Sequence, residues 1–210
     1  MTHKLVGEAG QVVEWGYTAG QAYDDPFNDV ELDVVMRHAD GDVWRIPAYW
    51  AGGREWRVRF APPKAGAYEA TTVCSNSADG VLQGTVSHLE VSPYQGDNPL
   101  VAHGPLRIAA SKRTFEHTDG TPFFWLGDTW WMGFCKRLSW PQDFQRLTAD
   151  RVAKGFTVIQ IVAGLYPDMP GFDERGANEA GFPWEEDYAR INPADFDRAD
   201  ERIAWLVRSG

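Results

Sequence analysis

The chain has 210 residues and a mass of 23.6 kDa, which is enough for one large domain or two smaller ones. Its 20 basic and 30 acidic side chains give a net charge of −10, which repels phosphate backbones and argues against a nucleic-acid partner. No uncharged apolar run approaches the roughly 18 residues of a membrane span. No secretory signal is visible at the start either, so we expect a cytoplasmic protein without a membrane partner.

The first half of the sequence has the period of two that is typical of β-strands. Val34 and Met36, for example, are followed by Val35 and Arg37 on the opposite face, so one face of this segment is expected to be buried. Similar short segments, separated by turn residues, occur at 12–17, 43–49, 56–60, 68–74 and 85–91. About seven short strands without a helical pattern predict an antiparallel, Ig-like β-sandwich over residues 1–95.

The period changes after a segment that is rich in proline and glycine. We expect a linker at residues 96–105, because this segment lacks periodicity. Residues 106–110 and 114–117 then predict a short hairpin, with a turn at Asp119-Gly120. A second domain is therefore expected over residues 106–210.

Two apolar runs in this second half, 122–126 and 156–163, predict strands that are buried on both faces, as in a parallel sheet. A helix between them is expected to begin at a capping box, Ser139 with Gln142, and to end at Gly155. A further helix is expected to begin at Asn192-Pro193. Its predicted apolar face consists of Phe196, Ala199, Ile203 and Leu206.

Alternating strands and helices imply a parallel sheet with right-handed crossovers. Residues 106–210 are therefore predicted to be the first part of a (β/α)8 TIM barrel, truncated after about two βα units. A complete barrel takes about 250 residues. We accordingly interpret the chain as the N-terminal part of a longer, multidomain protein.

Candidate ligand-binding residues follow from this architecture, because such barrels bind ligands just past the carboxyl ends of their strands. Asp128, Trp130 and Trp131 follow the first predicted strand, Gln160 lies near the end of the second, and Tyr166 lies in the loop beyond. A carboxylate beside flat aromatic faces suits a sugar ring, which presents both hydroxyls and C–H bonds. The structural alternative is that Asp128 caps a turn, the tryptophans pack the barrel rim and Gln160 forms a hydrogen bond within the barrel.

The sequence assigns no catalytic residue, metal or cofactor. Glycoside hydrolysis by two carboxylates needs a pair held roughly 5–10 Å apart, and the acidic loop 164–191 offers no way to choose one. Cys74 and Cys135 lie too far apart for a metal-ligand motif, and no phosphate loop or dinucleotide-binding motif is present.

Several of these segments resemble known families. Residues 104–107, 119–131 and 154–160 resemble the start of the apiosidase-like glycoside hydrolases, also called DUF4038 domains; 119–131 reads Asp-Gly-Thr-Pro-Phe-Phe-Trp-Leu-Gly-Asp-Thr-Trp-Trp. The helix that begins at Asn192-Pro193 also fits. Residues 28–32 and 56–62 resemble the β-sandwich, DUF5060, that often precedes this barrel.

This resemblance implies a TIM-barrel enzyme that cleaves glycosidic bonds in plant-type polysaccharides or related glycans. It also implies that the nucleophile and the acid/base carboxylate lie at the ends of later strands, beyond Gly210, so this segment alone is expected to be inactive. A non-catalytic carbohydrate-binding or scaffold protein with the same fold is the rival interpretation. A third possibility is that the sandwich itself binds glycan through Trp44, Trp50 and Trp56. The oligomeric state is left open.

Overall fold

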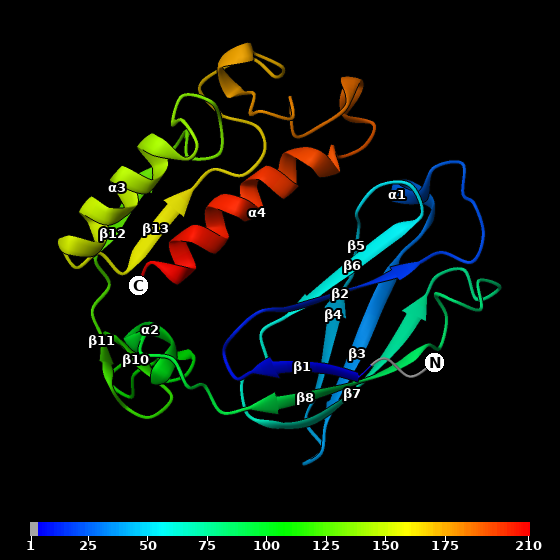
Figure 1. Ribbon diagram of the computed structural model, residues 1–210, viewed down its shortest axis with the longest axis horizontal. Helices are drawn as coiled ribbons and strands as arrows, with labels where there is room; N and C mark the ends of the chain where they lie inside the picture. The colour runs from blue at the N-terminus through cyan, green and yellow to red at the C-terminus, as the bar shows by residue number, and fades with distance from the viewer. Residues whose placement is uncertain (1–3) are drawn as a thin grey trace. The chain divides into compact units, whose positions relative to one another are not determined.

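The computed structural model describes residues 4–210 and divides into two compact units, one ending at Pro105 and the other comprising Leu106–Gly210. Most of the regular structure is β-strand, and the described residues form four α-helices, two of which have only four residues (Figure 1). None of the helices within residues 4–210 is long and apolar enough to cross a membrane. The chain is thus a β-rich protein of two units.

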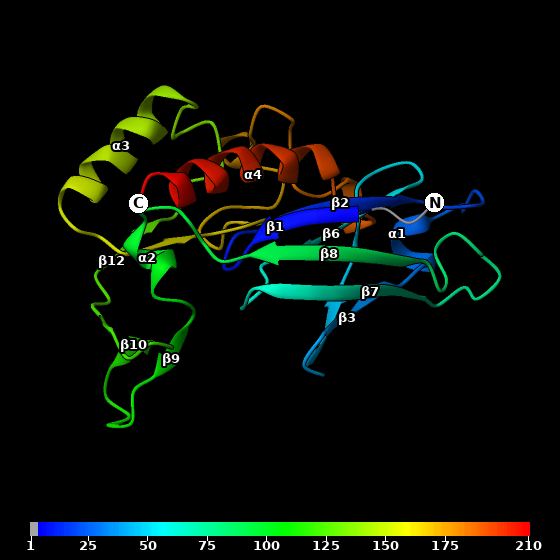
Figure 2. The ribbon, with the colours of Figure 1, turned by 60° about the horizontal axis from the view of Figure 1, so that its bottom comes forward.

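The first unit is a sandwich of two sheets. Its strands are β1 Lys4–Glu8, β2 Val13–Thr18, β3 Leu32–His38, β4 Val43–Pro47, β5 Tyr49–Trp50, β6 Glu55–Phe60, β7 Gly66–Cys74 and β8 Val86–Ser92. The larger sheet has the order β1-β8-β7-β3-β4, and the smaller has the order β2-β6-β5. Figure 2 shows β1, β8 and β7 side by side in the larger sheet.

The prediction of a wholly antiparallel sandwich is wrong at one edge. Strand β1 was not predicted, and it pairs parallel to β8, with Lys4 opposite His88 and Glu8 opposite Ser92. The other strand pairs of this unit are antiparallel. A five-residue edge strand that contains a glycine carries little alternation, so its sequence did not distinguish it from a loop.

The core of the sandwich consists of the alternating residues that the sequence singled out. Val34 and Met36 of β3 and Val58 of β6 are completely buried, while the arginines next to Val58 are partly exposed. Two short helices lie outside the sheets: α1 Pro26–Asp29 and α2 Pro99–Ala102. Helix α2 lies within the segment that was expected to be a linker.

The second unit begins with a small antiparallel sheet in the order β11-β10-β9; its strands are β9 Leu106–Ile108, β10 Phe115–His117 and β11 Pro122–Phe123. Between β10 and β11, the Thr121 backbone N–H donates to the Asp119 carboxylate at 2.8 Å, and Gly120 adopts a φ of 91°. The hairpin and its turn are therefore where the sequence predicted them.

The first predicted buried strand is misplaced. The apolar run 122–126 contributes only β11, and its next residues Phe124 and Trp125 are 74% and 55% exposed. The strand with parallel pairing is instead β12 Gly127–Trp130, which pairs with β13 Val158–Ile161. Apolar character alone indicated burial, but strand pairing, which the sequence does not show, begins five residues later.

Both long helices of this unit form close to where they were expected, but the capping box predicted at the start of the first is wrong. That helix begins at Gln142 without a side-chain cap, and the Ser139 hydroxyl instead donates to the Asp143 carboxylate at 2.6 Å. Helix α3 Gln142–Ala153 connects the parallel strands and ends just before Gly155, whose φ of 75° suits glycine. Helix α4 Pro193–Arg208 begins after Asn192, whose side chain accepts a hydrogen bond from the Ala194 backbone N–H. Two 3-10 turns, η1 Glu174–Gly176 and η2 Glu186–Tyr188, lie in the loop before α4.

Candidate functional site

The candidate site lies at the carboxyl ends of β12 and β13, which meet at one edge of the parallel pair. We call this edge the carboxyl edge. It is extended by two long segments, 131–141 after β12 and 162–192 after β13. In βα architectures, the loops at this edge carry the residues that contact ligands.

The sequence predicted that Asp128 follows the first strand of the parallel pair. The structure instead places it within that strand, β12, with its side chain facing α3. Its carboxylate accepts hydrogen bonds from the Thr129 backbone N–H at 2.8 Å, the Trp130 indole N–H at 2.8 Å and the Arg151 Nε at 2.5 Å. The guanidinium of Arg151, assisted by the other two donors, holds the pKa of this carboxyl below its ordinary value. These contacts give Asp128 a structural role in joining β12 to α3.

Trp130 is also directed toward the helix. Its ring is buried and packs edge-on against Phe144 of α3, with the ring centroids 5.4 Å apart. Trp131, the next residue, follows the end of β12 and is 47% exposed. Of the two tryptophans that the sequence singled out, Trp130 is therefore a packing residue, and Trp131 offers an accessible ring at the carboxyl edge.

The opposite face of the parallel pair is open. Thr129 and Gln160 are directly opposite each other in the pairing register, and both are exposed. Because side chains alternate along a strand, they lie on the face that α3 does not cover. An open depression of about 560 Å³ is lined by Trp125, Gly127, Asp128, Thr129, Val158, Ile159 and Gln160. Gln160 is thus accessible, and it lies near the end of β13, as predicted.

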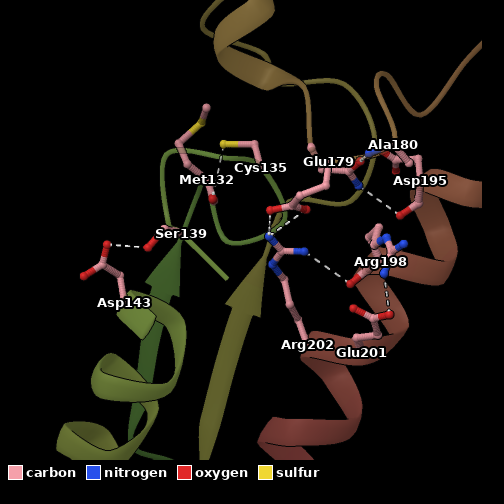
Figure 3. Close-up of polar contacts among 11 residues, drawn as sticks. Met132, Cys135, Ser139, Asp143, Glu179, Ala180, Asp195, Arg198, Glu201 and Arg202 are labelled. Carbon is pink, nitrogen blue, oxygen red and sulfur yellow. Dashed lines mark hydrogen bonds and ion pairs between the residues drawn. The ribbon is translucent and has the colours of Figure 1, made fainter. Parts of the chain in front are cut away.

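Tyr166 belongs to the loop that follows β13, and its side chain is buried. Burial, together with the neighbouring Cys135 thiol, raises the pKa of its hydroxyl well above the usual range. The Cys135 thiol is itself completely buried and lies 3.4 Å from the Met132 carbonyl oxygen (Figure 3). Tyr166 therefore supports the loop from inside and does not present its ring to solvent.

A buried arginine connects α4 to the same loop (Figure 3). Arg202 has no exposed surface, and its Nη2 donates to both carboxylate oxygens of Glu179, at 3.0 and 3.2 Å. Its guanidinium also lies over the ring of Trp140, 5.6 Å from the centroid. A buried charge is costly unless it is paired, so Arg202 needs the Glu179 carboxylate. The ion pair therefore holds the middle of the loop against the helix.

Asp195, in the first turn of α4, is a second buried charged residue of this cluster. Burial, with a further contribution from Glu179, raises the pKa of its carboxyl to about 6, although Arg202 acts in the opposite direction. Its backbone carbonyl accepts a hydrogen bond from the Asn178 side chain at 3.0 Å. Loop and helix are thus joined through main-chain as well as charged groups.

The sequence did not single out this cluster. The helical face predicted to be apolar does contain the buried Ala199, but Asp195 and Arg202 are buried beside it, whereas Ile203 is 43% exposed. The one sequence signal for this ion pair was Glu179, the partner of Arg202, which is one of the acidic residues of the loop 164–191. Nothing in the sequence indicated which of them faces α4.

Within residues 4–210, no group of three or more histidine, cysteine, aspartate or glutamate side chains is arranged to hold a metal ion. Of the three sandwich tryptophans singled out above, Trp44 and Trp50 are partly exposed and Trp56 is not. Trp56 is buried in the core, Trp44 packs against Phe60 and Tyr68, and the Trp50 indole donates to the Gly53 carbonyl. The carboxyl edge is the feature of the described chain best suited to a ligand.

Two family models match the chain. The model of the apiosidase-like catalytic domain matches residues 109–210, and the model of a domain of unknown function, DUF5060, matches residues 9–75. No curated protein is similar enough to match.

Among solved structures, a candidate glycoside hydrolase from Bacteroides vulgatus is similar over 98% of this chain, with 23% identity and a TM-score of 0.70. The chain spans 40% of the length of that protein. A family 123 glycoside hydrolase from Clostridium perfringens is aligned with the whole chain over 41% of its own length, at 12% identity and a TM-score of 0.33. The first similarity shows that the two chains share a fold, and the second is too loose to support an argument.

Proposed function

We propose that residues 109–210, which the model of the apiosidase-like catalytic domain matches, form the opening part of a (β/α)8 barrel in a glycoside hydrolase. The substrate would be a plant-type polysaccharide or a related glycan. The observation that carries this proposal is the parallel pairing of β12 with β13 through the crossover helix α3, within the segment that the family model matches.

The exposed face of this parallel pair supports the barrel. Parallel sheets are normally covered on both faces, yet the face with Thr129 and Gln160 is open in these residues. Further strands of a barrel would enclose it. The related Bacteroides vulgatus chain, of which this chain spans 40%, is long enough to contain them.

We assign different roles to the five candidate residues. Trp131 and Gln160 are accessible, so we propose that they contact the sugar. Asp128 and Trp130 position β12 against α3, and Tyr166 supports the loop from below. Asp128 remains a weaker candidate for a sugar contact, because its carboxylate already accepts three hydrogen bonds.

We propose that the catalytic carboxylate pair lies on later strands, outside these 210 residues. The local charges support this view. Glu179 is paired with the fully buried Arg202, and Asp195 is buried in the first turn of α4. Neither is arranged as half of a pair that faces a shared open site.

Hydrolysis is the direct test. A protein that continues this chain through a complete barrel should release reducing ends from a plant-type polysaccharide such as arabinoxylan or xyloglucan, and the 210-residue chain should not. In the longer protein, Trp131→Ala should lower kcat/KM by roughly 10–100-fold, equivalent to about 1.4–2.7 kcal/mol, without changing Tm. Glycan binding without hydrolysis by the longer protein would instead support the rival, a carbohydrate-binding protein.

A further inference from the structure

The loop after β13 carries an aromatic cluster that the roles assigned above do not use. Phe172, Trp184 and Tyr188 form this cluster, with Tyr188 centred 5.1 Å from Phe172 and 6.5 Å from Trp184. Tyr188 is nevertheless 48% exposed, so one part of its ring is packed and the other is open to solvent. A tyrosine ring held on one side and exposed on the other offers an apolar face and a polar hydroxyl to a ligand.

The segment that presents Tyr188 is a closed turn. Trp184 and Ile191 pair as an antiparallel bridge, and the Glu185 backbone N–H donates to the Arg190 carbonyl at 2.8 Å. The side chains of Glu185 and Arg190 form an ion pair at 2.9 Å across the same turn. Because the ends of the turn are fixed, the ring at its tip is held in place before any ligand arrives, which lowers the entropic cost of binding.

The backbone of this segment adopts conformations that its residues disfavour. Phe172, Asp187 and Tyr188 have φ values of 61°, 58° and 59°, in the left-handed region that bulky side chains rarely adopt. In addition, a Cβ atom at Gly171 would lie 2.2 Å from the Tyr188 hydroxyl, so glycine is needed there for the ring to lie where it does. Such strain persists where the surrounding structure enforces it, and it concentrates at functional sites.

The charge of the loop restricts what the ring could bind. Residues 162–192 contain seven carboxylates and only two arginines, and both arginines are paired, Arg175 with Asp173 and Arg190 with Glu185. An anionic glycan would be repelled by this excess of negative charge. A neutral sugar would not be repelled, and its hydroxyls could donate hydrogen bonds to the carboxylates.

We propose that Tyr188, supported by Phe172 and Trp184, is a stacking platform for a neutral sugar ring at the carboxyl edge, and that this loop disfavours uronic-acid-containing glycans. This inference rests on the proposed function and deepens it, because it names the residue and the substrate class.

The experiment uses the 210-residue chain on an array of neutral and uronate-containing plant oligosaccharides. We expect binding to neutral glycans. Tyr188→Ala should then weaken the affinity for the strongest array ligand by at least about 10-fold, whereas Tyr188→Phe, which keeps the ring, should stay within about 3-fold. Gly171→Ala should weaken binding like Tyr188→Ala, because it displaces the ring. Phe124→Ala is the matched control, since Phe124 is 74% exposed but precedes β12.

Stability separates stacking from packing. Tyr188→Gly removes the ring and accepts a positive φ, so it should weaken binding at least as much as Tyr188→Ala does. If binding is lost only in variants whose second unit is unfolded by circular dichroism, the ring is purely structural and the proposal is overturned. Equal binding by wild type and all Tyr188 variants would overturn it and leave the glycosidase proposal intact. Preference for uronate glycans would overturn the assigned substrate class. If no glycan binds at all, the platform proposal fails, whereas the glycosidase proposal is still decided by hydrolysis in the longer protein.

Discussion

At the scale of single residues, the contact between Asp128 and Arg151 joins the first strand of the parallel pair to the helix that packs on it. One carboxylate satisfies a backbone N–H, a buried indole N–H and a guanidinium at once. Removing it would leave the Trp130 indole without its acceptor inside a packed interface. Hydrogen bonds to a charged acceptor contribute more to stability than neutral ones.

We therefore predict that Asp128→Ala lowers the free energy of unfolding of the second unit by about 2 kcal/mol. Urea denaturation followed by tryptophan fluorescence and circular dichroism would measure this change. Asp150→Ala is the matched control, because Asp150 also pairs with Arg151 but is more exposed, and it should cost less. An equal loss in both variants would show that the position of Asp128 in β12 confers no special stability.

Asp195 leads to a prediction about pH. The pKa of its carboxyl is about 6 in the folded chain, above its ordinary value of 3.8, so the folded state binds this proton more tightly than the unfolded state does. The stabilisation from this proton is fully present below about pH 4 and is lost as the pH rises through 6. Asp195→Asn should remove this dependence and raise the free energy of unfolding at pH 7 by up to about 3 kcal/mol.

Unfolding measurements at pH 4, 5, 6 and 7 would test this prediction. Glu179→Gln is the contrasting variant, because its ion pair with Arg202 acts against burial and leaves the pKa of the Glu179 carboxyl below its ordinary value. Its stabilisation is therefore present at neutral pH and is lost on acidification, so the variant should be destabilised at pH 7 and resemble wild type in acid. Parallel pH profiles for wild type and Asp195→Asn would contradict the assignment to Asp195.

At the scale of elements, the features that sequence predicted well are those set by neighbouring residues. The start of α4 depends on Asn192 and the proline after it, and the end of α3 depends on Gly155. The features that were missed depend on distant partners. Strand β12 is defined by its pairing with β13, and the burial of Arg202 depends on Glu179, 23 residues earlier in the chain.

The Asn192 side chain has two functions, capping α4 and bonding to the preceding loop, and substitutions can separate their contributions to stability. Its Oδ1 caps α4 by accepting from the Ala194 N–H, while its Nδ2 donates to the carbonyls of Ala180 and Phe182 at 3.1 and 2.9 Å. Asn192→Ala should lose both functions and cost about 2 kcal/mol, and Asn192→Asp should keep the cap and cost less. If denaturation gives equal losses for the two variants, the cap itself contributes little.

At the scale of the whole chain, the period of two predicted a sandwich and the alternation of strands and helices predicted a parallel pair, because both patterns report burial on a face. The parallel edge strand β1 and the exposure of Phe124 and Trp125 were beyond such reasoning. Similarly, Trp131 and Trp130 are identical in sequence terms, and only the contact of Trp130 with Phe144 distinguishes the packed ring from the accessible one.

The two units should therefore differ in stability. The sandwich closes its own core between two sheets, whereas the second unit leaves one face of its parallel pair open and exposes Phe124, Trp125 and Ile203. Calorimetry of the 210-residue chain should show two transitions, with the second unit melting first and binding a hydrophobic dye before the sandwich unfolds. Asp128→Ala should shift only the lower transition, which would identify that transition as the unfolding of the second unit.

In a protein that continues through the proposed barrel, the amides of β12 and β13 should exchange more slowly than in the 210-residue chain, because further strands would cover them. Unchanged exchange would mean that the open face is not a barrel interior.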